Sequence, residues 1–243
     1  MRLIAKNKLI VALDVDSTRQ ALVLVNTLRD MVGMFKIGSQ LFASAGPEIV
    51  SELVRTGNRV FLDLKFHDIP NTVASAAVAA TRLGVSIFNV HASGGSEMMR
   101  CAADAVSEVA TNEGLKRPSI IAVTVLTSSD ATALSEIGIG SQPELQVRRL
   151  SLLAEACGMD GVVASPHEVD VVRSAVMNSG FLIVTPGVRL AGASSDDQKR
   201  VMTPAQAIRA GADYIVVGRP ITSAKDPVEA AGQILEEMES GLA

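Results

Sequence analysis

The feature of this 243-residue sequence that most restricts its fold is an alternation of short apolar runs with longer segments of helical periodicity. Eight such pairs follow one another, and the short runs are nearly continuous in Val, Ile and Leu. This composition is typical of parallel strands that are buried on both faces of a sheet. We expect strands at residues 9–15, 34–38, 59–65, 87–91, 119–127, 161–165, 181–187 and 214–219.

The segments between these runs carry apolar residues three and four positions apart, which predicts amphipathic helices. Ser, Asp and Pro favour the first positions of a helix, and they indicate starts at Ser17–Thr18, Pro47 and Asp226–Pro227. The expected core-facing stripes are Val73, Ala76, Ala77 and Ala80 after the third run, and Val228, Ala231, Ile234, Leu235 and Met238 near the end of the chain.

Eight β–α pairs predict an α/β fold with a single domain, a (β/α)8 TIM barrel over residues 1–243. A doubly wound open sheet also alternates strands and helices, but no Gly-x-Gly-x-x-Gly motif follows the first run. The polar residues favour the closed barrel, because they gather at the ends of the runs where barrel enzymes carry their active sites.

Charged or polar side chains stand at or just beyond the C-terminal ends of five of the runs. They are Asp14, Lys36, Asp63, Lys65, Thr127 and Arg219. In a barrel these ends meet at one mouth, and buried charges there are expected to pair with one another. An ion-pair cluster that only closes the barrel is the alternative, but four charges on three adjacent strands at the catalytic face favour a functional site.

Asp63 and Lys65 are two positions apart in one expected strand. Because successive side chains of a strand alternate between faces, both are expected to point to the same side. Phe61, two positions earlier, is expected to pack in the interior below them.

Two short motifs predict a phosphate site at the same mouth. Thr-Pro-Gly-Val-Arg at 185–189 and Val-Gly-Arg-Pro at 217–220 lie after the seventh and eighth strands, where such barrels often bind phosphate. They supply Gly187 and Gly218 together with Arg189 and Arg219. Either motif alone is ordinary turn chemistry, so it is the combination that favours phosphate binding.

The segment at residues 188–202 is expected to form a mobile lid over the ligand. It is rich in small and polar residues and exceeds the usual connection of about 2 to 6 residues. Lids are drawn from compositions of this kind. A disordered surface loop is the alternative.

Composition argues against several other classes of protein. The net charge of −4 and pI near 5.4 leave no basic stripe for nucleic acid. The first apolar run is interrupted by Asp14 and is too short for a signal peptide or a membrane span, so we expect a cytoplasmic protein. Cys101 and Cys157 stand singly in helical segments and are expected to be packing residues.

Residues 63–72 read Asp-Leu-Lys-Phe-His-Asp-Ile-Pro-Asn-Thr and resemble the D-x-K-x-x-D-[IV]-P-x-T signature of the orotidine 5'-monophosphate decarboxylase family, in particular its bacterial branch. The likeness extends over nearly the whole chain, through residues 12–16, 35–38, 123–128, 185–189, 197–204 and 211–220. It implies a carboxy-lyase that converts orotidine 5'-monophosphate to uridine 5'-monophosphate in de novo pyrimidine biosynthesis. It also implies that the enzyme uses neither a cofactor nor a metal.

The resemblance further implies a role for each matching residue. Lys65 would donate the proton, flanked by Asp63 and by Asp68 of the neighbouring subunit of a homodimer. The ribose would be bound by Asp14 and Lys36, with Thr72 of the neighbouring chain close by. The pyrimidine would contact Thr127, and the phosphate and closed lid would be served by Arg189, Gln198, Gly218 and Arg219. Some members of the family carry the lid glutamine earlier, where this chain has Ala191.

Two other functions stay open at this point. Sugar-phosphate decarboxylases and hexulose-phosphate synthases share the D-x-K-x-x-D core but use magnesium; residues 68–72 follow the nucleotide enzyme instead. A barrel that binds phosphate without catalysis is the second alternative. The three histidines, His67, His91 and His167, lack a metal-ligand spacing, and we expect a structural hydrogen-bonding role for His91.

Overall fold

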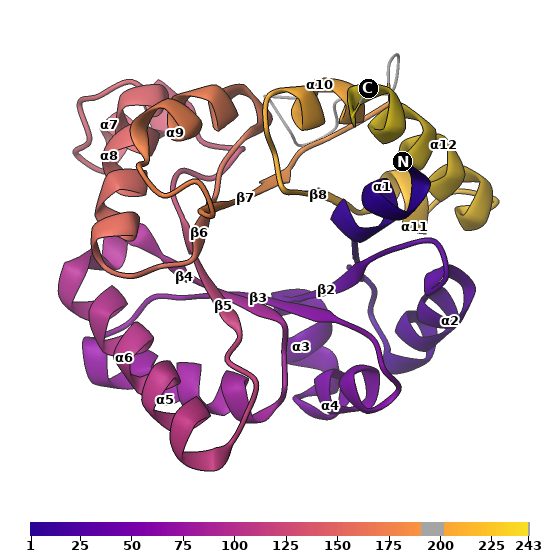
Figure 1. Cartoon of the computed structure of the whole chain (residues 1–243), viewed down its shortest axis with the longest axis horizontal. Helices are drawn as coiled ribbons and strands as arrows, with labels where there is room; N and C mark the ends of the chain where they lie inside the picture. Colours follow the sequence, from indigo (N-terminus) through magenta and orange to yellow (C-terminus); the bar gives the residue numbers. More distant parts are fainter. Residues whose placement is uncertain (191–201, 243) are drawn as a thin grey trace.

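The structure is a computed structural model that describes residues 1–190 and 202–242. Within these residues, eight parallel strands form a closed barrel in the order β1 to β8, surrounded by helices (Figure 1). The predicted TIM barrel is therefore confirmed, and the open sheet is excluded by the pairing of β8 with β1. The strands are β1 (Leu9–Ala12), β2 (Met34–Gly38), β3 (Val60–Phe66), β4 (Ile87–His91), β5 (Ser119–Val123), β6 (Gly161–Val163), β7 (Leu182–Pro186) and β8 (Tyr214–Val217).

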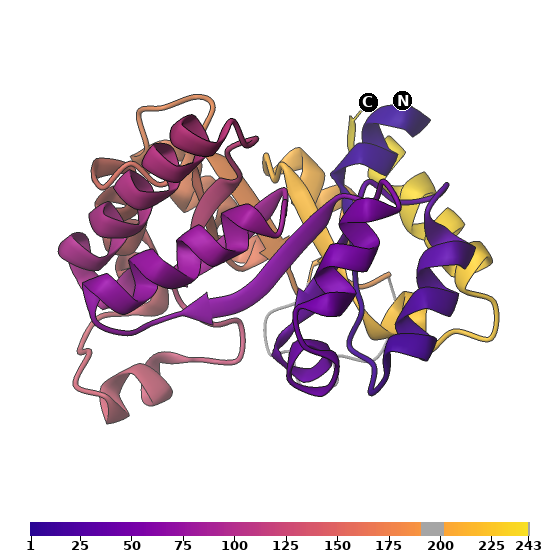
Figure 2. The same cartoon turned by 90° about the horizontal axis from the view of Figure 1, so that it is seen from below.

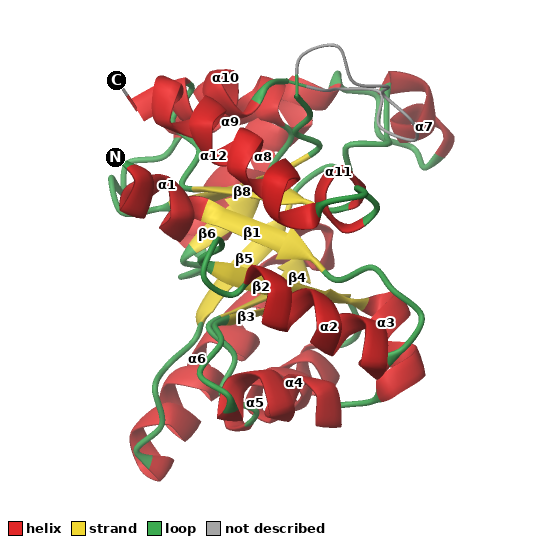
Figure 3. Ribbon diagram, turned by 90° about the vertical axis from the view of Figure 1, so that its right-hand side faces the viewer, coloured by secondary structure: helices red, strands yellow, loops and turns green. Residues whose placement is uncertain are grey.

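Helices cover the barrel on its outside, and Figure 3 shows the strands crossing the centre of the molecule between them. Two short 3-10 helices, η1 (Ala92–Gly94) and η2 (Pro166–Glu168), follow β4 and β6. The α-helices are α1 (Arg2–Lys8), α2 (Thr18–Leu28), α3 (Ser39–Ala45), α4 (Glu48–Arg55), α5 (Pro70–Arg82), α6 (Gly95–Glu113), α7 (Ala131–Glu136), α8 (Pro143–Ala156), α9 (Val169–Ala175), α10 (Pro204–Arg209), α11 (Arg219–Thr222) and α12 (Pro227–Leu242).

Alternation along the strands builds two separate apolar layers. The larger layer lies between the strands and the helices and includes Val11 and Phe88. The smaller layer fills the inside of the barrel. Its members are Ile10, Ala12, Met34, Phe61, Ile87, Ile121, Val184 and Val216. Because these side chains close the lower part of the barrel, polar chemistry is restricted to the mouth.

The predicted helix starts are confirmed, and two of the three carry a side-chain capping contact. The Ser17 hydroxyl accepts a hydrogen bond from the Gln20 N–H at 3.4 Å, and α2 begins at the next residue. Asp226 accepts from the N–H groups of Val228 and Glu229 at 2.9 and 3.0 Å. Pro47 immediately precedes α4, so each signal marks a real helix.

Several expected boundaries differ from the structure. The strands β1 and β5 end at Ala12 and Val123, earlier than predicted, because the polar residues that follow them belong to the loops of the mouth. The N-terminal segment before β1 forms α1, which packs against α12 where the first and last helices lie side by side (Figures 1 and 2). The stripe on α12 begins one turn later than expected, since Val228 is 39% exposed.

Within the described part of the chain, every helix is too short or too polar to span a membrane.

Cys157 is buried and Cys101 half-buried, and both thiols are free, in agreement with their expected packing role.

Candidate active site

A cavity of about 170 Å³ lies inside the mouth of the barrel. Its apolar floor includes Phe61, Val184 and Val216, which belong to the inner layer. Its polar wall consists of Lys36, Asp63, Lys65 and Thr127. Phe61, Asp63 and Lys65 therefore face the same interior, as the sequence predicts.

The four charges of the mouth form one continuous chain of alternating sign. Lys36 Nζ lies 3.1 Å from Asp14 Oδ1 and 3.3 Å from Asp63 Oδ2. The other oxygen of Asp63, Oδ1, lies 2.6 Å from Lys65 Nζ. The predicted mutual pairing is thus confirmed. The row of charges ends at the ammonium group of Lys65, whose side chain is 35% exposed and lines the cavity.

Burial makes the Asp63 carboxylate dependent on its partners. Burial by itself raises the pKa of this carboxyl, since a charged group loses its hydration. The ammonium groups of Lys36 and Lys65, with hydrogen bonds from Lys65 and Asn89, outweigh that effect and lower the pKa of Asp63 below its ordinary 3.8. Asp63 is therefore ionised at neutral pH despite being only 9% exposed.

Lys65 has an unusual backbone conformation. Its φ of 53° makes it the one non-glycine residue with positive φ in the described part of the chain. The pairing of β3 with β4 shifts at the same place, between Leu62 and Phe66. A left-handed conformation is unfavourable for a lysine, and such backbone outliers are often found at functional sites.

Asn89 is a site residue that the sequence analysis did not identify. Its Oδ1 accepts a hydrogen bond from the backbone N–H of Lys65 at 2.8 Å. Its Nδ2 donates to Asp63 Oδ1 at 2.7 Å. A signal was present, because Asn89 is the one polar residue within the apolar stretch 87–90 of β4 and shares the inward face with Ile87.

The residues predicted to bind phosphate lie after β7 and β8. Gly218 caps α11, and a Cβ built on it would lie 3.5 Å from Ala12 Cβ and 3.6 Å from Asp14 Oδ2. Arg219 follows it on α11 and is exposed. Arg189 is 6% exposed, and its Nη1 donates to the carbonyl of Val188 at 3.0 Å.

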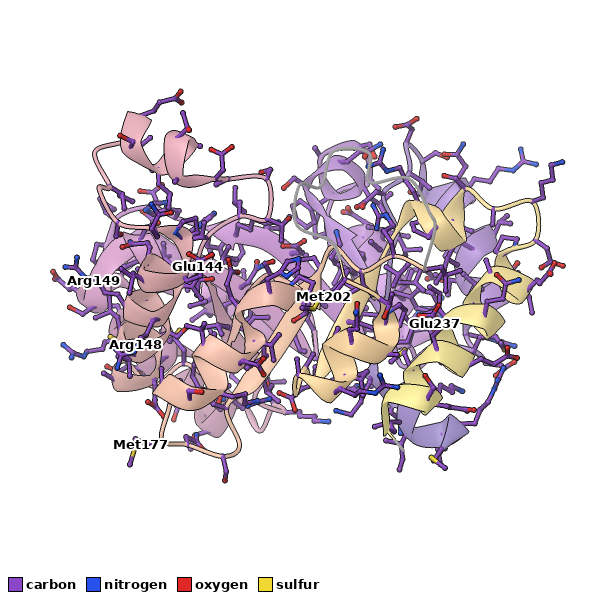
Figure 4. The ribbon with its side chains drawn as sticks, turned by 90° about the horizontal axis from the view of Figure 1, so that it is seen from above. Glu144, Arg148, Arg149, Met177, Met202 and Glu237 are labelled. Atoms are coloured by element: carbon purple, nitrogen blue, oxygen red, sulfur yellow. The ribbon has the colours of Figure 1, made fainter. Side chains whose placement is uncertain are left out.

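The chain on either side of the expected lid is joined at its base. The Arg189 N–H donates to the carbonyl of Met202 at 3.1 Å, and Val188 and Met202 form a parallel bridge. Figure 4 labels Met202, where the described chain resumes. Residues 191–201 of the expected lid, among them Gln198, lie outside the described residues.

Asp68 and Thr72 are not among the residues whose ion pairs form the charge chain. Both are exposed, and Asp68 Oδ1 accepts a hydrogen bond from the N–H of Ile69 at 2.6 Å. Thr72 lies in the first turn of α5, where its N–H donates to the Ile69 carbonyl at 3.0 Å. Within the described residues of one chain, Asp68 makes no ion pair with Lys65 or any other cation.

Two histidine rings lie in contact beside the charge chain, tilted relative to one another. The ring centroids of His67 and His91 are 5.4 Å apart at an interplanar angle of 36°. Burial lowers the pKa of His91, and the neighbouring charges of His67 and Lys65 lower it further. Among the described residues, His91 has this ring contact and no side-chain hydrogen bond, so its expected hydrogen-bonding role stays a prediction.

Comparison with known proteins places the chain in a family. Residues 7–234 match the model of the "Orotidine 5'-phosphate decarboxylase / HUMPS family". Proteins named orotidine 5'-phosphate decarboxylase are 53% identical over 239 residues in Trichlorobacter lovleyi and 55% identical over 240 residues in Moorella thermoacetica. The alignments cover 98% of this chain, with 98% of the first protein and 95% of the second.

A solved structure agrees with these relatives. The crystal structure of orotidine 5'-phosphate decarboxylase from Lactobacillus acidophilus superposes with a TM-score of 0.82 at 40% identity. The match covers 95% of this chain and 98% of that one. Fold, sequence and the match of nearly the full length agree, and the chain belongs to the orotidine 5'-phosphate decarboxylase / HUMPS family.

Proposed function

We propose that this chain is an orotidine 5'-phosphate decarboxylase, a carboxy-lyase of pyrimidine biosynthesis that converts orotidine 5'-monophosphate to uridine 5'-monophosphate and CO2. The single observation that carries the proposal is the chain of alternating charges that ends at Lys65 Nζ in the mouth of the barrel. The relatives that are about half identical over nearly the full length carry that name, which favours this function over the sugar-phosphate and non-catalytic alternatives.

The difficulty of the reaction lies in the electron pair left on the pyrimidine. When the bond between C6 and the carboxylate breaks, the pair stays on C6 in the plane of the ring and cannot enter the π system. Catalysis then depends on charges fixed in advance around the transition state. We assign this stabilising role to Lys65. Its ammonium faces the developing carbanion, transfers a proton to C6, and is left as a neutral amine that regains a proton from water.

Asp63 and Lys36 support Lys65 in this scheme. The 2.6 Å contact between Asp63 Oδ1 and Lys65 Nζ favours the protonated lysine. Lys36 holds the other oxygen of Asp63, so the carboxylate cannot rotate away without losing an ion pair. A negative charge beside the departing carboxylate also disfavours the substrate more than the transition state, and we treat that contribution as secondary.

The remaining predicted residues are proposed to bind the ribose, the pyrimidine and the phosphate of the nucleotide. Asp14 and Lys36 would hold the ribose, and Thr127, which lines the cavity, would contact the pyrimidine. Gly218 and Arg219 would bind the phosphate together with Arg189 and Gln198. Gly218 supports this arrangement because it lies beside Asp14 and has no side chain to occupy the space there. Phosphate contacts far from C6 can then contribute to catalysis by fixing the substrate in its reactive position.

We also propose that the enzyme is a homodimer whose active sites are completed across the interface. Asp68 has no cationic partner within the described residues of its own chain, although it lies only three residues beyond Lys65. Ile69, next to it, is 66% exposed and is therefore available for contact with a second copy. A second copy would cover Ile69 and bring Asp68 and Thr72 to the neighbouring active site.

One assay distinguishes the three functions. The purified protein is mixed with orotidine 5'-monophosphate, and the loss of orotate absorbance is followed with and without a strong chelator. The proposed function predicts rapid loss in both conditions. A sugar-phosphate enzyme of the same family would leave the absorbance unchanged and would act on a hexulose phosphate only when magnesium is present. A non-catalytic barrel would be inactive on both substrates.

A further inference from the structure

We propose that Asn89 is a positioning residue that holds the backbone of Lys65 and the carboxylate of Asp63 in the arrangement that proton transfer requires. The proposal rests on the proposed function, because it assigns Lys65 as the proton donor. It concerns a buried residue that is not among those lining the cavity and that acts through these two neighbours.

Asn89 occupies a place where a polar side chain needs a specific reason. It is 1% exposed in the middle of β4, and its neighbours Phe88 and Val90 are fully buried apolar residues. A buried amide is unfavourable unless its donor and acceptor are both satisfied. Both are satisfied here, by Lys65 on one side and by Asp63 on the other.

The chemistry of the two partners fixes the orientation of the amide. The backbone N–H of Lys65 can only donate, so it requires the Asn89 oxygen. The ionised carboxylate of Asp63 can only accept, so it requires the Asn89 nitrogen. Among side chains of this size, only asparagine, or a protonated aspartate, offers an acceptor and a donor in one planar group.

The hydrogen bond to Lys65 replaces a missing part of the sheet. Between Leu62 and Phe66, β3 advances four residues while its partner β4 advances only from Phe88 to Val90, which is two. Lys65 lies in this bulge with a φ of 53°, where the regular ladder does not bind its N–H. The Asn89 side chain takes over that bond and thereby stabilises the left-handed conformation.

The hydrogen bond to Asp63 sets the other half of the geometry. Asn89 Nδ2 and Lys65 Nζ approach the same oxygen, Oδ1, at 2.7 and 2.6 Å. Lys36 takes Oδ2 at 3.3 Å. Asn89 therefore links the main chain of Lys65 to the carboxylate that its own ammonium contacts, and this closed loop of contacts fixes where the ammonium lies.

The test compares Asn89→Leu with Asn89→Asp. In Asn89→Leu, which is similar in size but lacks both bonds, we expect kcat to fall at least about a hundredfold while KM changes only a few-fold. The low-pH limit of activity should also move upward, since Asp63 loses one of the hydrogen bonds that stabilise its charged form.

Asn89→Asp gives a sharper readout. Its ionised carboxylate repels Asp63, but once it binds a proton it again offers an acceptor and a donor. Its kcat/KM should therefore rise as the pH is lowered through a range where the wild-type profile is flat. A role in stability alone would not produce this partial rescue.

Ser151→Ala is the matched control, because Ser151 is a fully buried polar residue of α8 whose hydroxyl has no partner among the described residues. It should keep the wild-type kcat and pH profile. A crystal structure of Asn89→Leu provides a readout that does not depend on turnover: Lys65 should leave the left-handed region and its Nζ should move away from Asp63. An unchanged Lys65, or wild-type kcat in Asn89→Leu, would overturn the proposal; wild-type protein inactive on orotidine 5'-monophosphate would instead overturn the proposed function.

Discussion

In the proposed mechanism, the reactivity of Lys65 depends on the groups that hold the lysine as much as on the lysine itself. Its ammonium is the end of a chain of charges, and its backbone is held in a conformation that lysine does not favour. Asp63 forms ion pairs with Lys36 and Lys65. It also accepts a hydrogen bond from Asn89, which in turn binds the backbone N–H of Lys65. Preorganisation of this kind lets fixed charges act on a transition state without rearrangement.

The most direct test at this scale removes the ammonium. In Lys65→Ala we expect kcat for orotidine 5'-monophosphate to fall by roughly a thousandfold or more, because both electrostatic stabilisation and the proton donor are lost. Lys116→Ala is a control, since Lys116 is exposed and precedes the start of β5, at the end of the barrel opposite the mouth. Steady-state kinetics measures both, with circular dichroism to show that each variant is folded. Turnover of Lys65→Ala within tenfold of wild type would remove the lysine from the mechanism.

The lowered pKa of Asp63 makes a separate prediction for stability. A carboxyl whose pKa is lower in the folded than in the unfolded state stabilises the fold above the unfolded value, 3.8, and loses that contribution as the pH falls through the folded value. Asp63→Asn should therefore flatten the acid side of a plot of unfolding free energy against pH. Urea unfolding at a series of acidic pH values measures the slope. An equally steep curve in the variant would mean that Asp63 is not held ionised by its partners.

Sequence patterns predicted the charged residues of the mouth but not the contacts that hold those residues in place. Alternation along β3 correctly placed Asp63 and Lys65 on one side, yet the strand is bulged there, so simple alternation is not the full reason. Asn89 was missed because a single polar residue in an apolar strand has no spacing to another motif. Its role depends on a contact between two strands, which a pattern within one strand does not contain.

At the scale of elements, burial explains which boundaries were predictable. The strands β2 and β4 have the predicted limits, because each is an apolar run that ends where the barrel meets its mouth. The helix α1 was not predicted, since only Ala5 of its seven residues is buried and no apolar stripe marks it. Its position depends on contacts with distant segments, among them α12 and Gly33.

The contact between α1 and Gly33 is tested by adding one methyl group. A Cβ on Gly33 would lie 2.7 Å from the Cα and carbonyl oxygen of Asn7 and from the carbonyl oxygen of Lys6, all of them backbone atoms. We expect Gly33→Ala to lower the free energy of unfolding by about 1–3 kcal/mol, as overpacking does. Gly140→Ala is the matched control, because its Cβ would meet no atom within 4 Å and its φ is not positive. Chemical denaturation of both variants measures the difference, and equal stabilities would mean that α1 does not pack as described.

At the scale of the whole molecule, one chain forms the barrel, but one expected site charge, that of Asp68, makes no ion pair among its described residues. The closed ring of strands brings Asp14, Lys36, Asp63 and Lys65 together from three strands and their loops. Asp68 stays exposed, three residues beyond Lys65 in the chain. Periodicity within one chain cannot reveal which subunit uses Asp68, and only the resemblance to the family predicted a contribution across an interface.

Mixing two inactive variants tests that contribution. In Lys65→Ala the proton donor is absent, and in Asp68→Ala the carboxylate offered to the neighbour is absent. If Asp68 acts across a homodimer, a mixed dimer contains one site with an intact Lys65 from one chain and an intact Asp68 from the other, and a second site that lacks both. Random reassociation of equal amounts then makes about a quarter of all sites intact, because half of the dimers are mixed and each has one good site.

The expected result is that activity rises from near zero to about a quarter of the wild-type value after the two variants are unfolded together and refolded. Each variant refolded alone is the control for recovery, and sedimentation shows whether dimers form. If Asp68 served Lys65 of its own chain, neither subunit of a mixed dimer would carry both residues and activity would stay near zero. Restoration therefore requires that the two residues come from different chains, a conclusion that no single-chain variant can supply.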